Sequence, residues 1–210
     1  MNKEKTREWL KDKFNLTFLL VLLISIIIRL YYFFITKTQP VWWDEGDYLS
    51  ASLHWATGLP YKLNPQRPPL LPFLESLIFR IGGGEVLVRF LLILLPSIGL
   101  IIVTYLLGKE MYNKKVGLVA SFVMAVFWEV LFNTTRLHVE IPLLFFIGLS
   151  IYFFWKVFIK NEKKNYFWIF SLAFALAFLT KYTTFLLIPV FFLVLFLSER
   201  FKIFKDKYLW

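Results

Sequence analysis

Residues Phe14–Ile35 read FNLTFLLVLLISIIIRLYYFFI, an apolar run that contains a single charge, Arg29. About 20 such residues make a helix that can cross the hydrocarbon core of a bilayer. Arg29 lies near one end of the run, so we expect its side chain to extend to the lipid headgroups. This stretch therefore predicts a transmembrane helix.

The rest of the chain has the same apolar character. Of its 210 residues, 59% are hydrophobic, and the mean hydropathy is +0.64. A soluble domain contains roughly 45–50% apolar residues, so the excess must face lipid. The apolar segments are spread along the chain, which excludes a single anchor or a cleaved signal peptide. Cysteine is absent, which excludes disulfides, zinc–thiolate sites and a thiol nucleophile.

The remaining apolar segments predict the number of spans. Tyr166–Leu197 is too long for one ordinary span and carries Lys181 at its centre, so we predict two short helices that meet there. Leu70–Ile81 is too short to cross and is predicted to be an interfacial helix whose Glu75 faces water. The predicted fold is an all-α polytopic membrane protein with about six transmembrane helices. The predicted spans lie near residues 14–35, 86–107, 116–132, 141–158, 166–180 and 183–197, and the interfacial helix lies in an outer loop of residues 36–85.

The formal net charge of +10 would suit a nucleic-acid partner, but the positions of the charges argue against one. Lys and Arg fall in short runs between apolar segments, as charges that set membrane topology do. The positive-inside rule places all these runs in the cytoplasm only if the last apolar block crosses twice. We therefore predict cytoplasmic termini, residues 1–13 and 198–210, and chemistry on the outer or lumenal face. The expected location is the cell membrane, or the endoplasmic reticulum membrane in a eukaryote.

The first candidate site follows the first predicted span and reads Trp42-Trp43-Asp44-Glu45-Gly46-Asp47-Tyr48. Ionisable groups beside the hydrocarbon are energetically costly and therefore favour a functional interpretation. In that interpretation Asp44 is a general base toward an acceptor hydroxyl or amine. Trp43 and Tyr48 would contact the acceptor or the sugar. The alternative is a pair of aromatic-belt residues followed by a solvated acidic turn.

A second candidate site lies in Arg136-Leu137-His138-Val139-Glu140-Ile141-Pro142. Pro142 marks the start of a helix, which puts Glu140 where the helix dipole favours a carboxylate. His138 and Glu140 can point to one side and, with Asp44, are candidate ligands for a divalent metal such as Mg or Mn. The alternative is a capping glutamate beside an interfacial histidine.

Two further cations suit a phosphate at membrane level: Arg67, which precedes Pro68-Pro69, and Lys181. The alternative is a pair of side chains that extend to lipid headgroups. A small transporter is a further alternative for the whole chain. Against it, the charges gather at one membrane face rather than at the midplane, and the sequence shows no internal repeat.

These motifs in this order resemble the N-terminal half of the GT-C glycosyltransferases. The matching features are Asp44-Glu45 with a following Tyr, a Pro-Pro-Leu that opens a short helix, an Arg one turn before an acidic residue and Pro, and Leu179-Thr180-Lys181. The nearest branch looks like the dolichyl-phosphate-mannose–protein mannosyltransferases and the bacterial aminoarabinose transferases of lipid A. The resemblance runs from about Val41 to Pro189 within a GT-C-like domain of residues 14–197.

The resemblance implies a membrane enzyme that moves a sugar from a polyprenyl phosphate to a protein or glycolipid acceptor by inverting displacement. It implies that Asp44 is the general base or helps to orient the acceptor, and that Glu45 supports it. It also implies that Glu140, with His138, is the second acidic position, which binds a divalent metal in some members. The cations that would hold the phosphate are Arg67, Arg136 and Lys181.

The chain departs from the family in two respects. Arg67 stands where many relatives have Lys, which keeps the charge and changes its geometry. Family members also carry several more spans and often a soluble C-terminal domain. Three interpretations of the short length stay open: a truncated reading frame, a second subunit that supplies the rest, or a non-catalytic subunit derived from the enzyme.

Overall fold

A computed structural model describes residues 11–61, 64, 66–162 and 165–198. The predicted basic runs at residues 1–10 and 199–210, and Lys163 and Lys164, lie outside these ranges. Within them the chain is helical and contains no strand. The all-α prediction is therefore confirmed for the part of the chain that is described.

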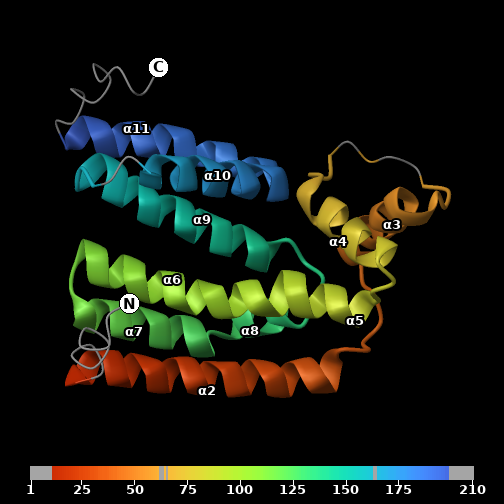
Figure 1. The fold of residues 1–210 in the computed structure, drawn as a ribbon, viewed down its shortest axis with the longest axis horizontal. Coiled ribbons are helices and arrows are strands. Elements are labelled where there is room, and N and C mark those ends of the chain that lie inside the picture. Colours follow the sequence, from red (N-terminus) through yellow and green to blue (C-terminus); the bar gives the residue numbers. More distant parts are fainter. Residues whose placement is uncertain (1–10, 62–63, 65, 163–164, 199–210) are drawn as a thin grey trace.

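Helices that lie side by side form the body of the molecule, with α2 at one edge and α11 at the other (Figure 1). The contacts run from α2 to α7, from α7 to α6, from α6 to α9 and from α9 to α10. The first half of this bundle contains α2 (Lys13–Thr36), α5 (Glu85–Val88), η1 (Arg89–Leu94), α6 (Leu95–Met111), α7 (Lys114–Val126) and α8 (Trp128–Thr134). The second half contains α9 (Glu140–Phe154), η2 (Trp155–Ile159), α10 (Asn165–Thr180), η3 (Tyr182–Leu186) and α11 (Leu187–Leu197).

The structure supports fewer spans than the six predicted. Among the described residues, three helices are long and apolar enough to cross a membrane: Lys13–Thr36, Glu85–Met111 and Glu140–Ile159. A fourth span exists if α7 and α8, which meet at a bend of 56°, count as one. The last apolar block does divide at Lys181, but α10 has only 16 residues. At about 1.5 Å per residue, such a helix falls short of a hydrocarbon core about 30 Å thick.

Close contact between α6 and α7 requires glycine at two facing positions. A Cβ atom added to Gly108 would lie 2.6 Å from the Gly117 Cα, and one added to Gly117 would lie 2.5 Å from the Tyr105 carbonyl oxygen. Small residues let membrane helices approach closely, which strengthens packing where no hydrophobic driving force exists between helices. This pair therefore keeps the two helices in register.

The helices outside the bundle are α3 (Asp44–Thr57) and α4 (Leu70–Arg80), which pack on each other at one end of the bundle (Figure 1). The predicted interfacial helix is α4. The acidic segment that we treated as a loop forms the first turn of α3, where its carboxylates suit the positive end of the helix dipole. Gly58 ends α3 with a φ of 79°, a left-handed conformation typical of helix C-caps.

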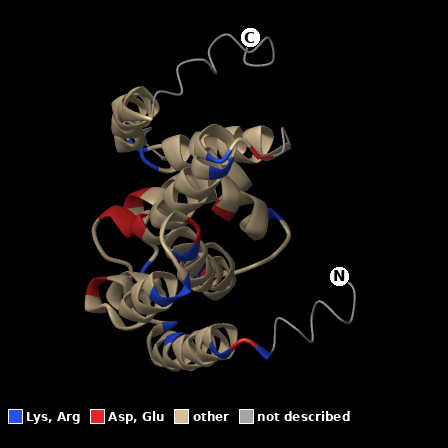
Figure 2. Cartoon of the chain, turned by 90° about the vertical axis from the view of Figure 1, so that its left-hand side faces the viewer, with Lys and Arg blue, Asp and Glu red and all other residues tan. Residues whose placement is uncertain are grey.

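Basic side chains and their ion pairs mark the opposite end of the bundle, which Figure 2 views directly. Lys114 at the start of α7 binds Asp12, which caps α2. Lys160 binds Glu110 at 2.6 Å, and so connects the end of η2 with the end of α6. The described members of the predicted basic runs thus gather at one end, away from α3 and α4.

Two predictions about single charges were wrong. Arg29 does not extend to headgroups, because its side chain is fully buried between helices. Glu75 does not face water, because α4 turns it toward α3 and buries it completely. Among the described residues, neither carboxylate oxygen of Glu75 has a hydrogen-bond partner, since the nearby Ser52 hydroxyl donates to the Leu49 carbonyl oxygen. Burial raises the pKa of Glu75 to about 8. The sequence around each residue specifies a helix, whereas its burial depends on which helix packs against that face.

Candidate active site

A salt bridge between α3 and the loop before α4 forms one side of the site. Arg67 donates from Nη1 to Asp44 Oδ2 at 2.7 Å and from Nη2 to the other oxygen of the same carboxylate. Its Nε donates to Asp47 Oδ2 at 3.2 Å. Bonding to Asp44 raises the pKa of Arg67 above its usual value. One guanidinium thus holds two carboxylates that lie three residues apart on one face of α3.

Tyr48 supports this salt bridge from inside the protein. Its ring centroid lies 5.6 Å from the Arg67 guanidinium carbon, and its side chain packs beside Leu71 and Val139. Burial raises the pKa of the Tyr48 hydroxyl to about 12, so the phenol is neutral. The predicted sugar contact at Tyr48 therefore lies beneath Arg67, and only 3% of the residue is exposed. Trp43, by contrast, is 79% exposed.

Glu45 joins the two candidate segments of the sequence. Its Oε2 accepts a hydrogen bond from the Trp42 backbone N–H at 2.7 Å, and its Oε1 accepts one from the Leu137 N–H at 2.9 Å. Arg136 Nη1 lies 3.5 Å and His138 Nε2 lies 4.0 Å from this carboxylate. Because Glu45 is fully buried, it fixes the loop before α9 against the start of α3.

Arg136 is enclosed by aromatic rings and backbone. Its guanidinium carbon lies 5.3 Å from the Trp42 ring centroid and 5.7 Å from the Phe132 ring centroid. Nη1 also donates to the Pro40 carbonyl oxygen at 3.2 Å. These contacts and the nearby Glu45 carboxylate hold Arg136 against the loop, while its buried Nε has no hydrogen-bond partner among the described residues. In this conformation Arg136 holds the loop in place.

His138, Glu140 and Lys181 form the other side of the site. Lys181 Nζ donates to Glu140 Oε1 at 3.1 Å, and both side chains are about 40% exposed. His138 Nδ1 lies 3.9 Å from Glu140 Oε2 and 3.0 Å from Asn133 Oδ1. Glu140 begins α9, as Pro142 predicted. The two acidic segments therefore converge, with His138 lying between Glu45 and Glu140.

The residues predicted to bind a metal do not fit such a site in this arrangement. In the described part of the chain, no group of three or more His, Asp and Glu side chains could hold an ion together. Both carboxylate oxygens of Asp44 accept hydrogen bonds from Arg67, and Glu140 accepts one from Lys181. A metal at His138 and Glu140 would compete with these cations, so no step below passes through one.

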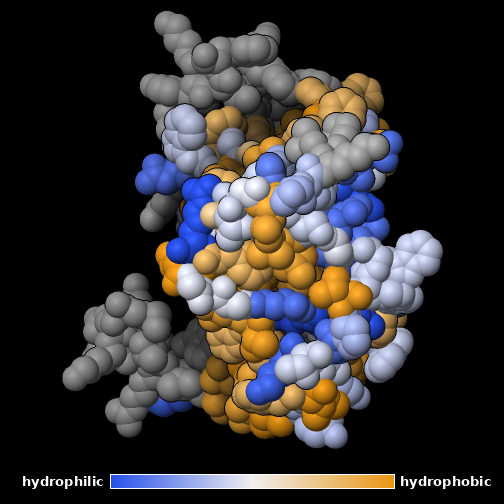
Figure 3. Space-filling view, turned by 90° about the vertical axis from the view of Figure 1, so that its right-hand side faces the viewer, coloured by the Kyte–Doolittle hydropathy of each residue, from blue (hydrophilic) through white to orange (hydrophobic). Residues whose placement is uncertain are grey.

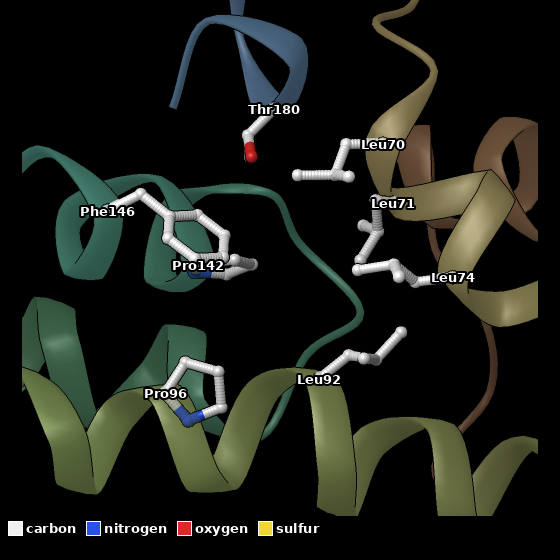
Figure 4. Close-up of a pocket in the computed structure, with 8 residues that line it drawn as sticks. All are labelled: Leu70, Leu71, Leu74, Leu92, Pro96, Pro142, Phe146 and Thr180. Atoms are coloured by element: carbon white, nitrogen blue, oxygen red, sulfur yellow. The ribbon is translucent and has the colours of Figure 1, made fainter. Parts of the chain in front are cut away.

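An apolar pocket adjoins the charged residues (Figure 4). It lies between α4, the η1–α6 helix, the start of α9 and the end of α10, and it is lined by Leu70, Leu71, Leu74, Leu92, Pro96, Pro142, Phe146 and Thr180. Leu71 contacts the cluster that contains Tyr48, and Thr180 immediately precedes Lys181. The pocket thus lies next to Tyr48, which packs under Arg67, and one residue along the chain from Lys181.

Each predicted cation of the site has an acidic partner. Arg67 binds Asp44 and Asp47, Lys181 binds Glu140, and Arg136 lies beside Glu45. Figure 3 faces this end of the molecule, where hydrophilic side chains lie among hydrophobic ones. An anion that entered here would have to displace a carboxylate from its cation.

Sequence reasoning missed the roles of two polar residues. Asp47 shares Arg67 with Asp44, and its spacing of three residues on an acidic helix could have indicated this. Asn133 binds the ring of His138 at 3.0 Å, although no sequence pattern connects the two.

Comparison with known proteins identifies the family of this chain. Residues 66–210 match the family described as dolichyl-phosphate-mannose-protein mannosyltransferase. The chain belongs to this family. The matched region includes Arg67, His138, Glu140 and Lys181, whereas the Asp44–Tyr48 segment precedes it. The family consists of membrane glycosyltransferases of the GT-C type.

A curated relative from Aquifex aeolicus (strain VF5) carries the description "Uncharacterized protein". It is 28% identical over 200 residues, which cover 89% of this chain and 40% of the relative. The chain thus spans about 40% of the length of the Aquifex aeolicus relative. No solved structure matches the chain.

Proposed function

We propose that this chain carries the active site of a glycosyltransferase that uses a polyprenyl-phosphate sugar. The observation that carries the proposal is the Arg67–Asp44 salt bridge beside an apolar pocket. A lipid-linked sugar phosphate needs an apolar surface for its chain, cations for its phosphate and a carboxylate near the anomeric carbon. These three requirements meet between α3, α4, α9 and α10.

The donor would lie with its hydrocarbon chain against the leucines of α4 and with its phosphate between Arg67 and Lys181. Arg67 can grip two phosphate oxygens through the Nη1–Nη2 edge that Asp44 occupies. Phosphate and Asp44 therefore compete for one edge of the guanidinium. Donor binding would free the Asp44 carboxylate, and Asp47 would keep Arg67 in place through Nε.

The freed Asp44 would accept the proton of the acceptor hydroxyl or amine as that atom attacks the anomeric carbon. The new bond forms as the bond from the anomeric carbon to the phosphate oxygen breaks, so the configuration inverts. The electron pair of that bond leaves with the polyprenyl phosphate. Arg67 and Lys181 would stabilise the charge that develops on the leaving phosphate.

We also propose how the chain is oriented in the membrane. A topology of six crossings, in which the short helices α10 and α11 cross as a pair, would put the described basic runs on the cytoplasmic side and the site on the outer or lumenal side. The gathering of Lys114, Lys160 and their ion pairs at the end opposite α3 supports this orientation. Protein or glycolipid acceptors would then approach near the exposed Trp43.

The test is transfer by membranes that contain the chain. Membranes are incubated with radiolabelled polyprenyl-phosphate sugars of several hexoses and pentoses, and labelled protein and glycolipid are separated. We expect product from one donor, and about 10²–10⁴-fold less from membranes that contain an equal amount of Asp44→Asn. Absence of product with every donor, in membranes where the folded chain is present, would refute the proposal.

A further inference from the structure

Arg29 is a fully buried cation inside a predicted span, and it binds groups from two other helices, α6 and α7. Nε donates to Ser97 Oγ of α6 at 2.7 Å, and Nη1 donates to Ser25 Oγ of its own helix at 2.6 Å. Nη1 and Nη2 donate to the carbonyl oxygens of Ala125 and Met124, at 3.0 and 3.3 Å. Among the described residues, no carboxylate forms an ion pair with Arg29.

The two carbonyl groups lie where α7 ends and the chain bends by 56° into α8. In an uninterrupted helix they would accept from the backbone N–H groups four residues later. Inside a bilayer, a backbone group without a partner costs several kcal/mol. Arg29 supplies donors at the bend and thereby stabilises the broken geometry of α7 and α8.

A second connection runs from Arg29 into α8 itself. Ser97 Oγ lies 2.8 Å from Thr134 Oγ1, and Thr134 Oγ1 donates to the Val130 carbonyl oxygen at 2.7 Å. Thr134 uses its one hydroxyl proton in the bond to the Val130 carbonyl oxygen. The Ser97 hydroxyl must therefore donate to Thr134 Oγ1, and it accepts from Arg29 Nε. The three side chains thus form one directional hydrogen-bond chain, and all three are buried.

The last residues of α8 hold two residues of the site. The Phe132 ring lies under Arg136, and Asn133 Oδ1 lies 3.0 Å from His138 Nδ1. Asn133 uses its Nδ2 group to donate to the Glu129 carbonyl oxygen at 2.9 Å, so its Oδ1 accepts from His138. This bond places the proton of a neutral His138 on Nδ1 and leaves Nε2 toward Glu45.

Thr135, the residue after α8, is also held in place by hydrogen bonds. Arg89, also buried, donates to the Thr135 carbonyl oxygen at 2.9 Å and to the Gln39 carbonyl oxygen at 3.3 Å. Glu85 Oε1 accepts from Arg89 Nε at 2.9 Å and fixes the guanidinium. Arg29 from α2 therefore holds the end of α7 that leads into α8, and Arg89 from η1 holds the residue that follows α8.

We infer that Arg29 is a positioning residue for the site: it locates α8, and α8 sets the ring of His138 through Asn133. This inference deepens the proposed function and rests on it for the meaning of the site. The physical reason is that α8 has only seven residues. A helix this short has little stability of its own and takes its position from its tertiary contacts.

The test follows the His138 ring by nitrogen NMR in lipid nanodiscs. The chain contains two histidines, so the His54→Gln background, purified without a histidine tag, leaves His138 as the single signal. We compare Asn133→Ala, which removes the direct partner, with Arg29→Gln and Ser97→Ala, which act through α8. Tyr105→Phe is the matched control, because Tyr105 also joins α2 and α6 by a buried hydrogen bond, to Asn15 at 3.1 Å.

We expect Asn133→Ala to move the ring-nitrogen signals away from the Nδ1–H form. Arg29→Gln should move them in the same direction, Ser97→Ala should do so to a smaller extent, and Tyr105→Phe should leave them unchanged. Circular dichroism confirms that each variant folds, and if Arg29→Gln does not, Ser97→Ala decides. Parental signals in the folded Arg29→Gln and Ser97→Ala variants would overturn the inference, as would an equal change in Tyr105→Phe or no change in Asn133→Ala.

This measurement uses no sugar donor. A chain that shows the coupling but transfers no sugar would leave the inference intact and refute the proposed function. If the chain transfers sugar but its His138 ring-nitrogen signals are unchanged by Arg29→Gln and Ser97→Ala, only the inference is refuted.

Discussion

The Arg67 guanidinium binds both carboxylate oxygens of Asp44, a residue 23 positions earlier in the chain. Bidentate pairing of this kind is specific in geometry as well as strong. It joins the loop before α4 to the first turn of α3. It also means that the predicted base and the predicted phosphate ligand neutralise each other until a substrate separates them.

Asp44→Asn should lower sugar transfer by about 10²–10⁴-fold, the range expected for loss of a general base. The Michaelis constant for the donor should not rise, because the substitution removes the carboxylate that competes with phosphate for Arg67. Initial rates over a range of donor concentrations separate the two effects. Asp47→Asn, which retains the base, should cause a smaller loss. A raised donor constant with an unchanged maximal rate would assign Asp44 to donor binding instead.

Arg67→Gln should reduce transfer by about 10²–10³-fold, as the loss of a donor to developing charge does in other enzymes. Arg67→Lys should lose less, since it keeps the charge, yet a single ammonium cannot grip Asp44 and Asp47 together. Rates in membranes at matched protein levels test this order. Arg80→Gln is the control, because Arg80 donates to the Trp55 carbonyl oxygen at the far end of α4. If Arg80→Gln reduced the rate of transfer as much as Arg67→Gln does, a general loss of positive charge would explain both results.

Glu45→Ala should destabilise the protein strongly, because it removes the acceptor of the Trp42 and Leu137 N–H groups and the buried carboxylate beside the Arg136 cation. Breaking a buried ion pair costs roughly 3–5 kcal/mol. Unfolding in mixed micelles measures the change. Glu110→Ala, which removes the more exposed pair with Lys160, should cost about 1 kcal/mol or less. Equal costs for the two variants would contradict the positioning role of Glu45.

Glu75 should make stability depend on pH. Its pKa is raised by burial from 4.5 to about 8, so the folded state holds a proton that the unfolded state releases above about pH 4.5. The stability associated with Glu75 is therefore fully present below that pH, falls as pH rises toward 8, and then levels off. Glu75→Gln should flatten this slope and stabilise the protein at pH 8. Thermal unfolding midpoints measured between pH 5 and pH 9 test this prediction. If the midpoint changes equally with pH in the parent and in Glu75→Gln, Glu75 is not the cause.

Local patterns were sufficient for much of the architecture. Hydropathy located α2, α6, α7 and α9, and the short apolar segment Leu70–Ile81 became α4. Proline and glutamate marked the start of α9. The segments of the site were also evident, because carboxylates beside the hydrocarbon are costly wherever the chain places them. These properties depend on residues that are near in sequence.

Other features depended on which helices became neighbours. Arg29 was expected at the headgroups and lies instead at the bend between α7 and α8. Glu75 was expected in water and lies against α3. The last two helices divide where predicted but are too short to count as ordinary spans.

The sequence by itself determined that this protein is a helical membrane protein and which segments carry its charged chemistry. The tertiary structure decided the partner of each charge: Asp44 with Arg67, Glu45 with two backbone N–H groups, and Arg29 with two carbonyl groups. The physical reason is one of range. Helix formation and burial in lipid follow from the composition of a segment, whereas desolvation and pairing of a charge depend on groups that folding brings from distant positions.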